Sequence, residues 1–331
     1  MNKVIRMAVL GVLALGLVGG FILCGVSAWA QKAKPPNPPP PAADPAIAYV
    51  VNARNSGKLM VMNADGSNQK VVLSERFFEY ACPDWSPDGR SLVFTRQDYR
   101  TGGIGIYIIN VDGTGLRKVT ETREFWNAVS WSPLPLADGL FKISFTDYPR
   151  RQDGTYEGQT DAFMVNLDGT GRVNLTNTPA VGEGLLSWSP TADRVTFPAA
   201  DPVTGAGGFV ICRVNYSEGV FSLEPVSTCF DFGFGIWANT QDKIVVGRGG
   251  EGWANDLWVY DMSMPNASYQ LTSTQYNYEH DQSWSPDDSK ILFVQGPSGQ
   301  LYVINADGTG LTPICPGVDF TWRWPGWRRN R

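Results

Sequence analysis

Short apolar runs alternate with polar, glycine-containing turns from residue 47 onward. The runs are rich in Val, Ile, Tyr and Phe and have the length of β-strands, as in IAYVV at 47–51, SLVFT at 91–95 and IYIIN at 106–110. Runs of this kind bounded by turn residues indicate strands. No stretch of this part shows the 3.6-residue apolar period of an amphipathic helix, so the pattern predicts an all-β fold.

Two motifs repeat along the same part of the chain. Trp-Ser-Pro begins at Trp85, Trp131, Trp188 and Trp284, with a degenerate copy at Trp237, so successive tryptophans are 46, 57, 49 and 47 residues apart. A second motif, Asn-x-Asp-Gly, begins at Asn63, Asn110, Asn166 and Asn305, with degenerate copies near Asn215 and Asp261. Four strand-like runs in each of six periods predict a six-bladed β-propeller with four-stranded blades.

The turn residues agree with this fold. Ser-Pro-Asp-Gly after Trp85 places Pro where a φ near −65° is needed, Asp where its side chain can bond the local backbone, and Gly at the exit. We expect this turn to join the innermost strand of a blade to the second, and Asn-x-Asp-Gly to join the third to the fourth. The turn that follows Pro133 is longer. The repeated Trp is expected to pack between neighbouring blades.

The two ends of residues 47–331 predict how the ring closes. The run at 47–51 reads as a second strand whose blade lacks a first strand, and VDFTWRWPGW at 318–327 reads as a first strand with its Trp. We expect this C-terminal strand to complete the first blade and to leave no free sheet edge at the closure.

The repeat resembles the propeller repeat of TolB and its relatives, the WD40-like PD40 repeat family. The resemblance rests on WSPDG at 85–89, followed by LVF, and on IYIINVDGTG at 106–115, and it covers nearly all of 47–331. It implies a TolB-like propeller. TolB itself carries an extra α/β domain before its propeller, where this sequence has a proline-rich spacer. Related propellers cap prolyl-oligopeptidase-type hydrolases, but no hydrolase domain is expected here.

The N-terminal residues indicate export. Lys3 and Arg6 precede an apolar run over 7–26, and Ala28-Trp29-Ala30 has the small-x-small pattern of a signal peptidase site. Residues 1–30 are therefore a signal peptide or, if uncleaved, an N-terminal membrane anchor. Residues 31–46 contain seven prolines and form a linker of polyproline type. The expected location is the periplasm or the outside of the cell.

Charge and composition narrow the chemistry. The formal net charge of −5 argues against a nucleic-acid partner. His280 is the single histidine, no G-x-S-x-G stands in the sequence, and no phosphate-binding or dinucleotide fingerprint is present. We therefore expect no metal and no cofactor. After signal cleavage four cysteines remain, Cys82, Cys212, Cys229 and Cys315, which allow three disulfide pairings. The expected strand register does not place Cys212 beside Cys229.

Strand order assigns the connections to two faces of the disc. The Ser-Pro-Asp-Gly and Asn-x-Asp-Gly turns fall on one, which we call the turn face. The connections that vary in length and content fall on the other, the variable-loop face, where function on a rigid scaffold tends to lie. These loops combine acids with aromatic rings. The candidate binding residues are Glu79, Tyr80, Glu124, Phe125, Trp126, Glu183, Asp231, Phe232, Tyr278, Glu279, His280, Asp319 and Trp322.

We interpret these residues as a rim of acids and exposed rings around the central channel. Exposed aromatic patches mark protein or sugar contacts, and the acids would favour a basic partner segment. The alternative is that the rings pack between blades and the acids are solvated. The prediction is a monomeric, exported, non-enzymatic scaffold of the cell envelope that binds a protein or a peptide. The alternative function is a carbohydrate-binding or glycoside hydrolase-like propeller that uses two rim carboxylates.

Overall fold

The computed structural model describes residues 46–53, 56–125, 129–150, 153, 155, 158–178, 182–200, 207–229, 235–249, 255–264, 267–274, 279–296, 299–314 and 326–327. The predicted signal segment and proline-rich linker lie outside the described residues and remain predictions. None of the described residues belongs to a helix long and apolar enough to cross a membrane.

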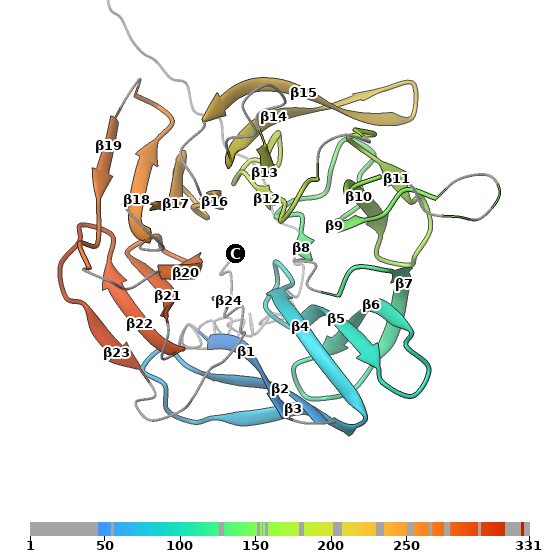
Figure 1. Ribbon diagram of the computed structural model, residues 1–331, viewed down its shortest axis with the longest axis horizontal. Helices are drawn as coiled ribbons and strands as arrows, with labels where there is room; N and C mark the ends of the chain where they lie inside the picture. The colour runs from blue at the N-terminus through green and yellow to red at the C-terminus, as the bar shows by residue number, and fades with distance from the viewer. Residues whose placement is uncertain are drawn as a thin grey trace, which may run out of the picture. The chain divides into compact units, whose positions relative to one another are not determined.

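Within these residues, strands of antiparallel sheets make up six four-stranded blades (Figure 1). Blade 1 runs outward as β24 (Gly326–Trp327), β1 (Ala46–Ala53), β2 (Ser56–Asn63) and β3 (Lys70–Arg76). Blade 2 consists of β4 (Phe78–Trp85), β5 (Ser91–Asp98), β6 (Ile104–Asn110) and β7 (Arg117–Thr122). Blade 3 consists of β8 (Ser130–Trp131), β9 (Lys142–Asp147), β10 (Asp161–Asn166) and β11 (Val173–Asn174).

The other three blades follow the same order. Blade 4 consists of β12 (Ser187–Trp188), β13 (Arg194–Ala200), β14 (Gly207–Ser217) and β15 (Val220–Cys229). Blade 5 consists of β16 (Gly235–Trp237), β17 (Lys243–Gly249), β18 (Asn255–Asp261) and β19 (Ala267–Gln270). Blade 6 consists of β20 (Glu279–Trp284), β21 (Lys290–Gln295), β22 (Gln300–Asn305) and β23 (Thr312–Ile314). The predicted six-bladed, all-β fold is confirmed.

The ring closes as the sequence predicts. β24 pairs antiparallel with β1, with Trp327 opposite Ile47 and Gly326 opposite Ala48. The first blade therefore takes its innermost strand from the C-terminal part of the chain, and Figure 1 shows β24 at the centre of the ring beside β1. This pairing covers the inner edge of β1, which would otherwise offer unpaired backbone groups to another chain.

The repeated tryptophans pack between blades, as expected. Trp85 of β4 is 1% exposed and shares a hydrophobic cluster with Val50 and Leu59 of blade 1. Two indoles also bond to the preceding blade: Trp188 Nε1 donates to Ser144 Oγ at 2.9 Å and Trp284 Nε1 donates to the Ile236 carbonyl at 3.1 Å. At these two junctions a large buried ring with a satisfied N–H stabilises the contact through both packing and hydrogen bonding.

The Asn-x-Asp-Gly turns satisfy their own polar groups. The Asp112 carboxylate accepts the Thr114 N–H at 2.9 Å and the Thr114 hydroxyl at 2.6 Å, and these hydrogen bonds hold the pKa of Asp112 below its usual value. Asp168 and Asp307 make the same bonds to Thr170 and Thr309. Their polar groups are engaged locally, so these repeated turns leave few groups on the turn face to bind a ligand.

The glycine of this turn also permits a close approach between blades. Gly169, in the turn between β10 and β11, has φ +88°, and a Cβ added there would lie 2.4 Å from the Val119 carbonyl oxygen of β7. Gly139, in the turn between β8 and β9, has a similar φ of +79° but faces open space. The two positions therefore separate backbone strain from steric contact.

Gly169→Ala is expected to destabilise the protein more than Gly139→Ala. A left-handed φ costs a non-glycine residue roughly 1–2 kcal/mol, so the free energy of unfolding of both variants should fall by this amount. The Gly169 variant also forces blades 2 and 3 apart, which adds about 1–3 kcal/mol. Urea unfolding followed by tryptophan fluorescence measures both, and equal losses in the two variants would show that the blade junction tolerates the methyl group.

The degenerate turn at Trp237 takes its support from the next blade. It lacks Ser-Pro-Asp-Gly, and its backbone donors instead bond to Asp288 of blade 6, at 2.7 Å from Asn239 N, 2.8 Å from Thr240 N and 3.1 Å from Gln241 N. Asp288 is 2% exposed and has φ +56°. It stands where blade 2 has Gly89, so one carboxylate replaces the missing turn residues of its neighbour.

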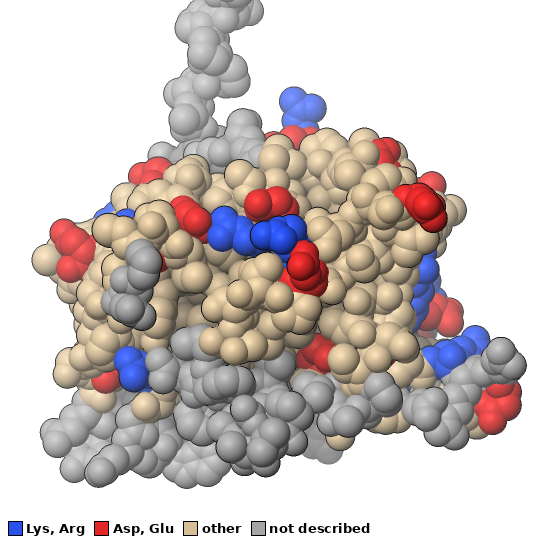
Figure 2. Space-filling model, turned by 90° about the horizontal axis from the view of Figure 1, so that it is seen from above, with Lys and Arg blue, Asp and Glu red and all other residues tan. Residues whose placement is uncertain are grey.

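Seen from the side, the described part of the disc carries interspersed charges. Figure 2 shows acidic and basic side chains separated by larger uncharged areas, without a continuous area of one sign. The described residues on this side therefore form no large surface of one charge sign, which a long-range attraction to a charged polymer would need.

Candidate functional site

Two of the predicted rim acids are buried and hydrogen-bonded to neighbouring segments of the chain. Glu279 is 1% exposed and accepts hydrogen bonds from Thr274 Oγ1 at 2.6 Å, Thr272 Oγ1 at 3.2 Å and Gln295 Nε2 at 3.2 Å. The same Thr-x-Thr segment binds Asp256, since Thr274 N donates to Asp256 Oδ1 at 2.9 Å. Burial raises the pKa of Glu279. This side chain ties β20 to β21 and to the threonine segment that follows β19.

Glu183 occupies the equivalent position before β12. It is 5% exposed, its Oε1 accepts the Thr178 hydroxyl, and its Oε2 is buried with no hydrogen-bond partner within the described part of the chain. Thr178 N donates to Asp161 Oδ1 at 3.0 Å, and Asn174 Nδ2 donates to Asp161 Oδ2 at 2.6 Å. Burial, reinforced by the Asp161 charge, raises the pKa of Glu183 to about 7.

The protonated form of Glu183 is therefore more favourable in the folded state than in an unfolded chain, so the stability of the fold depends on pH. In an unfolded chain the Glu183 pKa is 4.5. Between the two values the folded state binds a proton that the unfolded state lacks, so the free energy of unfolding falls as pH rises from about 4.5 to about 7. We expect this group to contribute roughly 3 kcal/mol of that loss.

Glu183→Gln is expected to remove this part of the pH dependence. The amide keeps an oxygen for the Thr178 hydroxyl but carries no charge, so the variant should match the wild type near pH 5 and exceed its stability at pH 8. Denaturant unfolding at both pH values measures the difference. Glu218→Gln, at an exposed turn position, is the control. The same pH slope in wild type and Glu183→Gln would mean that Glu183 is ionised in the fold.

Two of the predicted aromatic contacts are also interior. Tyr80 is fully buried, its hydroxyl donates to Glu75 Oε2 at 2.8 Å, and its ring meets Phe94 edge to face at 5.6 Å. Phe125 is 7% exposed and packs on Ala81 and Cys82. The expectation of exposed aromatic side chains is wrong for Tyr80 and Phe125, because both are buried in the hydrophobic interior of the propeller.

The other described candidates lie nearer to solvent. Glu79 accepts a hydrogen bond from the Tyr99 hydroxyl, and Glu124 is half-buried with its N–H bonded to Thr122 Oγ1 at 3.2 Å. His280 Nδ1 lies 2.9 Å from Asp281 Oδ2. Trp126, Asp231, Phe232, Tyr278, Asp319 and Trp322 lie outside the described residues. Because Glu183 and Glu279 are buried, the acidic rim that suggested a basic partner is not formed by those two residues.

Two of the described cysteines, Cys82 and Cys212, are buried thiols. Burial raises the pKa of Cys82, with Asp281 and Glu124 adding to the effect, and burial raises the pKa of Cys212 to about 11. Both thiols are protonated at neutral pH, which makes them poor nucleophiles. The register pairs Cys212 with Pro225 and Cys229 with Phe209, so Cys212 and Cys229 are not opposite each other, as expected. Cys315 lies outside the described residues.

The variable-loop face holds a cleft that the motifs did not reveal. It has a volume of about 870 Å³ and lies between blades 2 and 3. Its walls come from the β5–β6 connection at 101–104, the end of β7, the residues after β9 at 147–150, and the segment around β11. We call it the blade 2–3 cleft. Its residues are scattered over the sequence, and none of them belongs to a repeated motif that could have marked the site.

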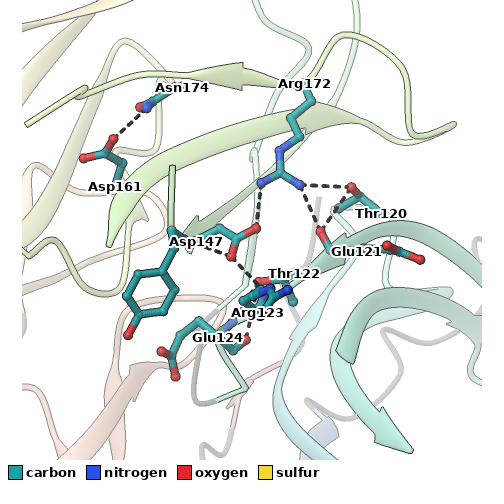
Figure 3. Close-up of polar contacts among 10 residues, drawn as sticks. Thr120, Glu121, Thr122, Arg123, Glu124, Asp147, Asp161, Arg172 and Asn174 are labelled. Atoms are coloured by element: carbon teal, nitrogen blue, oxygen red, sulfur yellow. Dashed lines mark hydrogen bonds and ion pairs between the residues drawn. The ribbon is translucent and has the colours of Figure 1, made fainter. Parts of the chain in front are cut away.

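Arg172 and Asp147 organise this cleft (Figure 3). Arg172 Nη2 donates to Asp147 Oδ2 at 2.6 Å, and Nη1 donates to the Glu121 carbonyl at 3.0 Å. The guanidinium lies 4.7 Å from the ring centroid of Phe163. Asp147 is 3% exposed and also accepts the Arg123 N–H at 2.8 Å. A cation stacked on a ring and bonded to a buried carboxylate is held in a fixed position, so blade 3 and the β7–β8 connection are fastened together there.

The described residues of the cleft lining include more basic than acidic side chains. Among the described residues, its lining contains Lys118, Arg123, Arg150 and Arg172 and two carboxylates, Glu121 and Asp147. Lys118 Nζ is paired with Glu121 Oε1 at 2.7 Å. Arg123 and Arg150 are both exposed. Elsewhere in the described chain, three or more His, Cys, Asp or Glu side chains do not gather into a group that could hold a metal ion.

Comparison with known proteins agrees with this architecture. The family model of the TolB beta propeller domain, PD40, matches residues 42–330. The chain belongs to the TolB β-propeller family. The blade 2–3 cleft and the repeated turns are thus features of one TolB propeller, and the resemblance inferred from WSPDG and IYIINVDGTG is confirmed.

Individual relatives of this TolB propeller match only part of its length. The Tol-Pal system protein TolB of Anaeromyxobacter dehalogenans is 37% identical over 136 residues, which are 41% of this chain and 27% of the relative. The Tol-Pal system protein TolB of Francisella tularensis is 27% identical over 110 residues, 33% of this chain and 22% of the relative. The matched region thus spans about a quarter of these relatives.

Solved structures share the fold at low sequence identity. A putative TolB from Agrobacterium tumefaciens has a TM-score of 0.57 at 15% identity and covers 81% of this chain and 88% of its own. A chain of a nidogen/laminin complex has a TM-score of 0.61 at 10% identity, covering 87% and 99%. An acylaminoacyl peptidase has a TM-score of 0.51 at 14% identity, covering 83% and 46%. These likenesses concern the propeller fold alone.

Proposed function

We propose that the chain is an exported, non-enzymatic scaffold of the cell envelope that binds a protein or a peptide on its variable-loop face. The observation that carries the proposal is the contrast between the two faces. The turn face consists of repeated turns such as that of Asp112, whose polar groups bond within the turn. The variable-loop face holds the blade 2–3 cleft, with a volume of about 870 Å³, within the range of ligand-binding clefts.

Three further points support this function. The matched relatives are Tol-Pal system proteins by name, and propellers of this family offer a rigid platform for loops. The N-terminal residues have the pattern of a signal segment followed by a proline-rich linker. Two of the rim acids that glycoside hydrolysis could use, Glu183 and Glu279, are buried and bonded to threonines. The carbohydrate alternative has no comparable observation in its favour.

Site-specific photo-crosslinking tests the proposal on the full chain in the cells that produce it. A photoreactive amino acid is placed at Tyr99, Arg123 or Arg150, which are exposed on the variable-loop face. The matched positions on the turn face are Leu116, Leu140 and Leu311, also exposed. We expect discrete protein adducts from the first set only, in the extracytoplasmic fraction. Adducts from neither set, or equally from both, would reject the variable-loop face as the binding surface.

A further inference from the structure

Two segments of the chain repeat one polar arrangement. In blade 5, the Asp256 carboxylate of β18 accepts a hydrogen bond from Thr274 N at 2.9 Å. In blade 3, the Asp161 carboxylate of β10 accepts the corresponding bond from Thr178 N at 3.0 Å and a second one from Asn174 Nδ2 at 2.6 Å. In each of these blades a carboxylate of the third strand therefore holds the segment that follows the fourth strand.

The two arrangements differ at the glutamate that comes next. Glu279 accepts three side-chain hydrogen bonds, which reach both of its oxygens. At Glu183 the Thr178 hydroxyl bonds to Oε1, while the buried Oε2 has no partner within the described part of the chain. The strand register places Ala199 of blade 4 at the position of Gln295, a donor to Glu279, and alanine has no side-chain donor. Burial with few donors penalises an ionised carboxylate, so Glu183 tolerates ionisation less well than Glu279.

The groups around Glu183 make its ionisation more costly. The Asp161 carboxylate, which is 1% exposed, raises the Glu183 pKa further. The Cys212 thiol of β14, with a pKa raised to about 11, is neutral near pH 7. Asp147, opposite Asp161 on β9, is already paired with Arg172 at 2.6 Å. An ionised Glu183 therefore repels the same carboxylate that holds the segment after β11.

This segment is also a wall of the blade 2–3 cleft. Asn174 and Asn177 line the cleft, and Asn174 Oδ1 accepts the Asn177 N–H at 3.1 Å. Thr176 Oγ1 accepts the Ala162 N–H at 3.0 Å. Because β11 is only two residues long, the position of the wall depends on these hydrogen bonds rather than on a long sheet pairing.

We propose that Glu183 is a pH-sensitive switch: its protonated form keeps residues 174–178 on blade 3 and the cleft wall in place, and its ionised form releases them. As the pH rises, Glu183 gives its proton to the solvent, and release of the segment lets Glu183 and Asp161 reach water. This inference rests on the proposed function, because the cleft lies on the proposed binding face, and it specifies how that site is regulated. Binding that uses the wall formed by Asn174 and Asn177 weakens as the pH rises.

Hydrogen–deuterium exchange of the full-length chain in detergent tests the switch without any ligand. The reporting amides are those of Leu175, Thr178 and Glu183, which all donate within the arrangement. The pKa of Glu183 is 4.5 in an open segment and about 7 in the closed one, so opening becomes about tenfold more favourable between about pH 6 and pH 8. After correction for the intrinsic rate, we expect the protection of these amides to fall by this factor. The amides of Leu271 and Thr274 in the blade 5 arrangement should change less than about twofold.

Glu183→Gln is the variant expected to remove the response, since the amide keeps an oxygen for the Thr178 hydroxyl and carries no charge. Glu279→Gln is the matched control, in which the amides of residues 174–178 should keep their response of about tenfold. Equal protection of the wild-type amides at the two pH values would overturn the inference. The same response in Glu183→Gln would also overturn it, by assigning the response to another group. The comparison of the two segments within the wild type decides the question even if a variant is unstable.

The switch and the scaffold function can fail separately. With a photoreactive residue at Arg150, which lines the cleft, we expect fewer protein adducts in medium of about pH 8 than of about pH 6, and equal adducts when the chain also carries Glu183→Gln. Adducts that do not change with pH, beside the expected exchange response, would refute the regulatory role and keep the scaffold function. The exchange response without any crosslinked partner from the variable-loop face would leave the switch in place and refute the scaffold function.

Discussion

Asp288→Ala is expected to lower the free energy of unfolding by about 3–5 kcal/mol. The Asp288 carboxylate accepts three backbone N–H groups and the Thr240 hydroxyl, the latter at 2.6 Å. Its removal leaves these partly buried donors of the blade 5 turn without their acceptor, and a hydrogen bond to a charged group contributes about 1.5–3 kcal/mol. Alanine also keeps the strained left-handed backbone at this position, so nothing offsets the loss.

Asp287→Ala is the matched control, because it removes the same group from the adjacent residue. Asp287 bonds only within its own turn, to Ser285 Oγ at 2.7 Å and Ser289 Oγ at 2.8 Å. We expect it to cost about 1 kcal/mol. Denaturant unfolding of both variants gives the comparison. Similar small losses in both would show that water replaces Asp288 as the acceptor of the blade 5 turn.

Trp327→Ala is expected to cost about 3–5 kcal/mol and to open the ring. Trp327 is 3% exposed and belongs to the cluster formed with Ile47 and Val294 across blades 1 and 6. It is also half of the two-residue strand that covers β1. Loss of the indole side chain removes most of the packing that holds β24 in place. The edge of β1 then becomes available to proteases and to other chains.

Trp237→Ala separates these two effects. Trp237 is equally buried, on the inner strand β16. The four strands of blade 5 follow one another in the sequence, so this blade is not closed by a distant strand. We expect a comparable loss of stability from Trp237→Ala and faster proteolysis only from Trp327→Ala. Limited proteolysis below the unfolding transition, with mass spectrometry of the first cuts, measures this. First cuts at the same places in the two variants would mean that β24 remains docked without its indole.

The fold was predictable because its signals are local. Gly169 in its turn and Trp188 at its blade junction each follow from a few neighbouring residues, and the repeat multiplies that information. The candidate site was less predictable, since burial depends on contacts between distant segments. Glu183 reads like a solvated acid in sequence, yet it is buried in the fold and bonded to Thr178 in the segment after β11. Arg172 and Asp147 are 25 residues apart, and no pattern links them, so their ion pair and the cleft above it emerged only from the arrangement of the blades.

The pairing of β24 with β1 links residues 47 and 327 and so governs the order of folding. Contacts that join distant parts of a chain form late, because the entropy of closing the intervening loop must be overcome first. During synthesis the first blade therefore cannot be completed until a strand made some 280 residues later is available. The ring can close only after the chain has been made through Trp327. A product cut short before this residue therefore keeps an open blade that quality-control proteases can recognise.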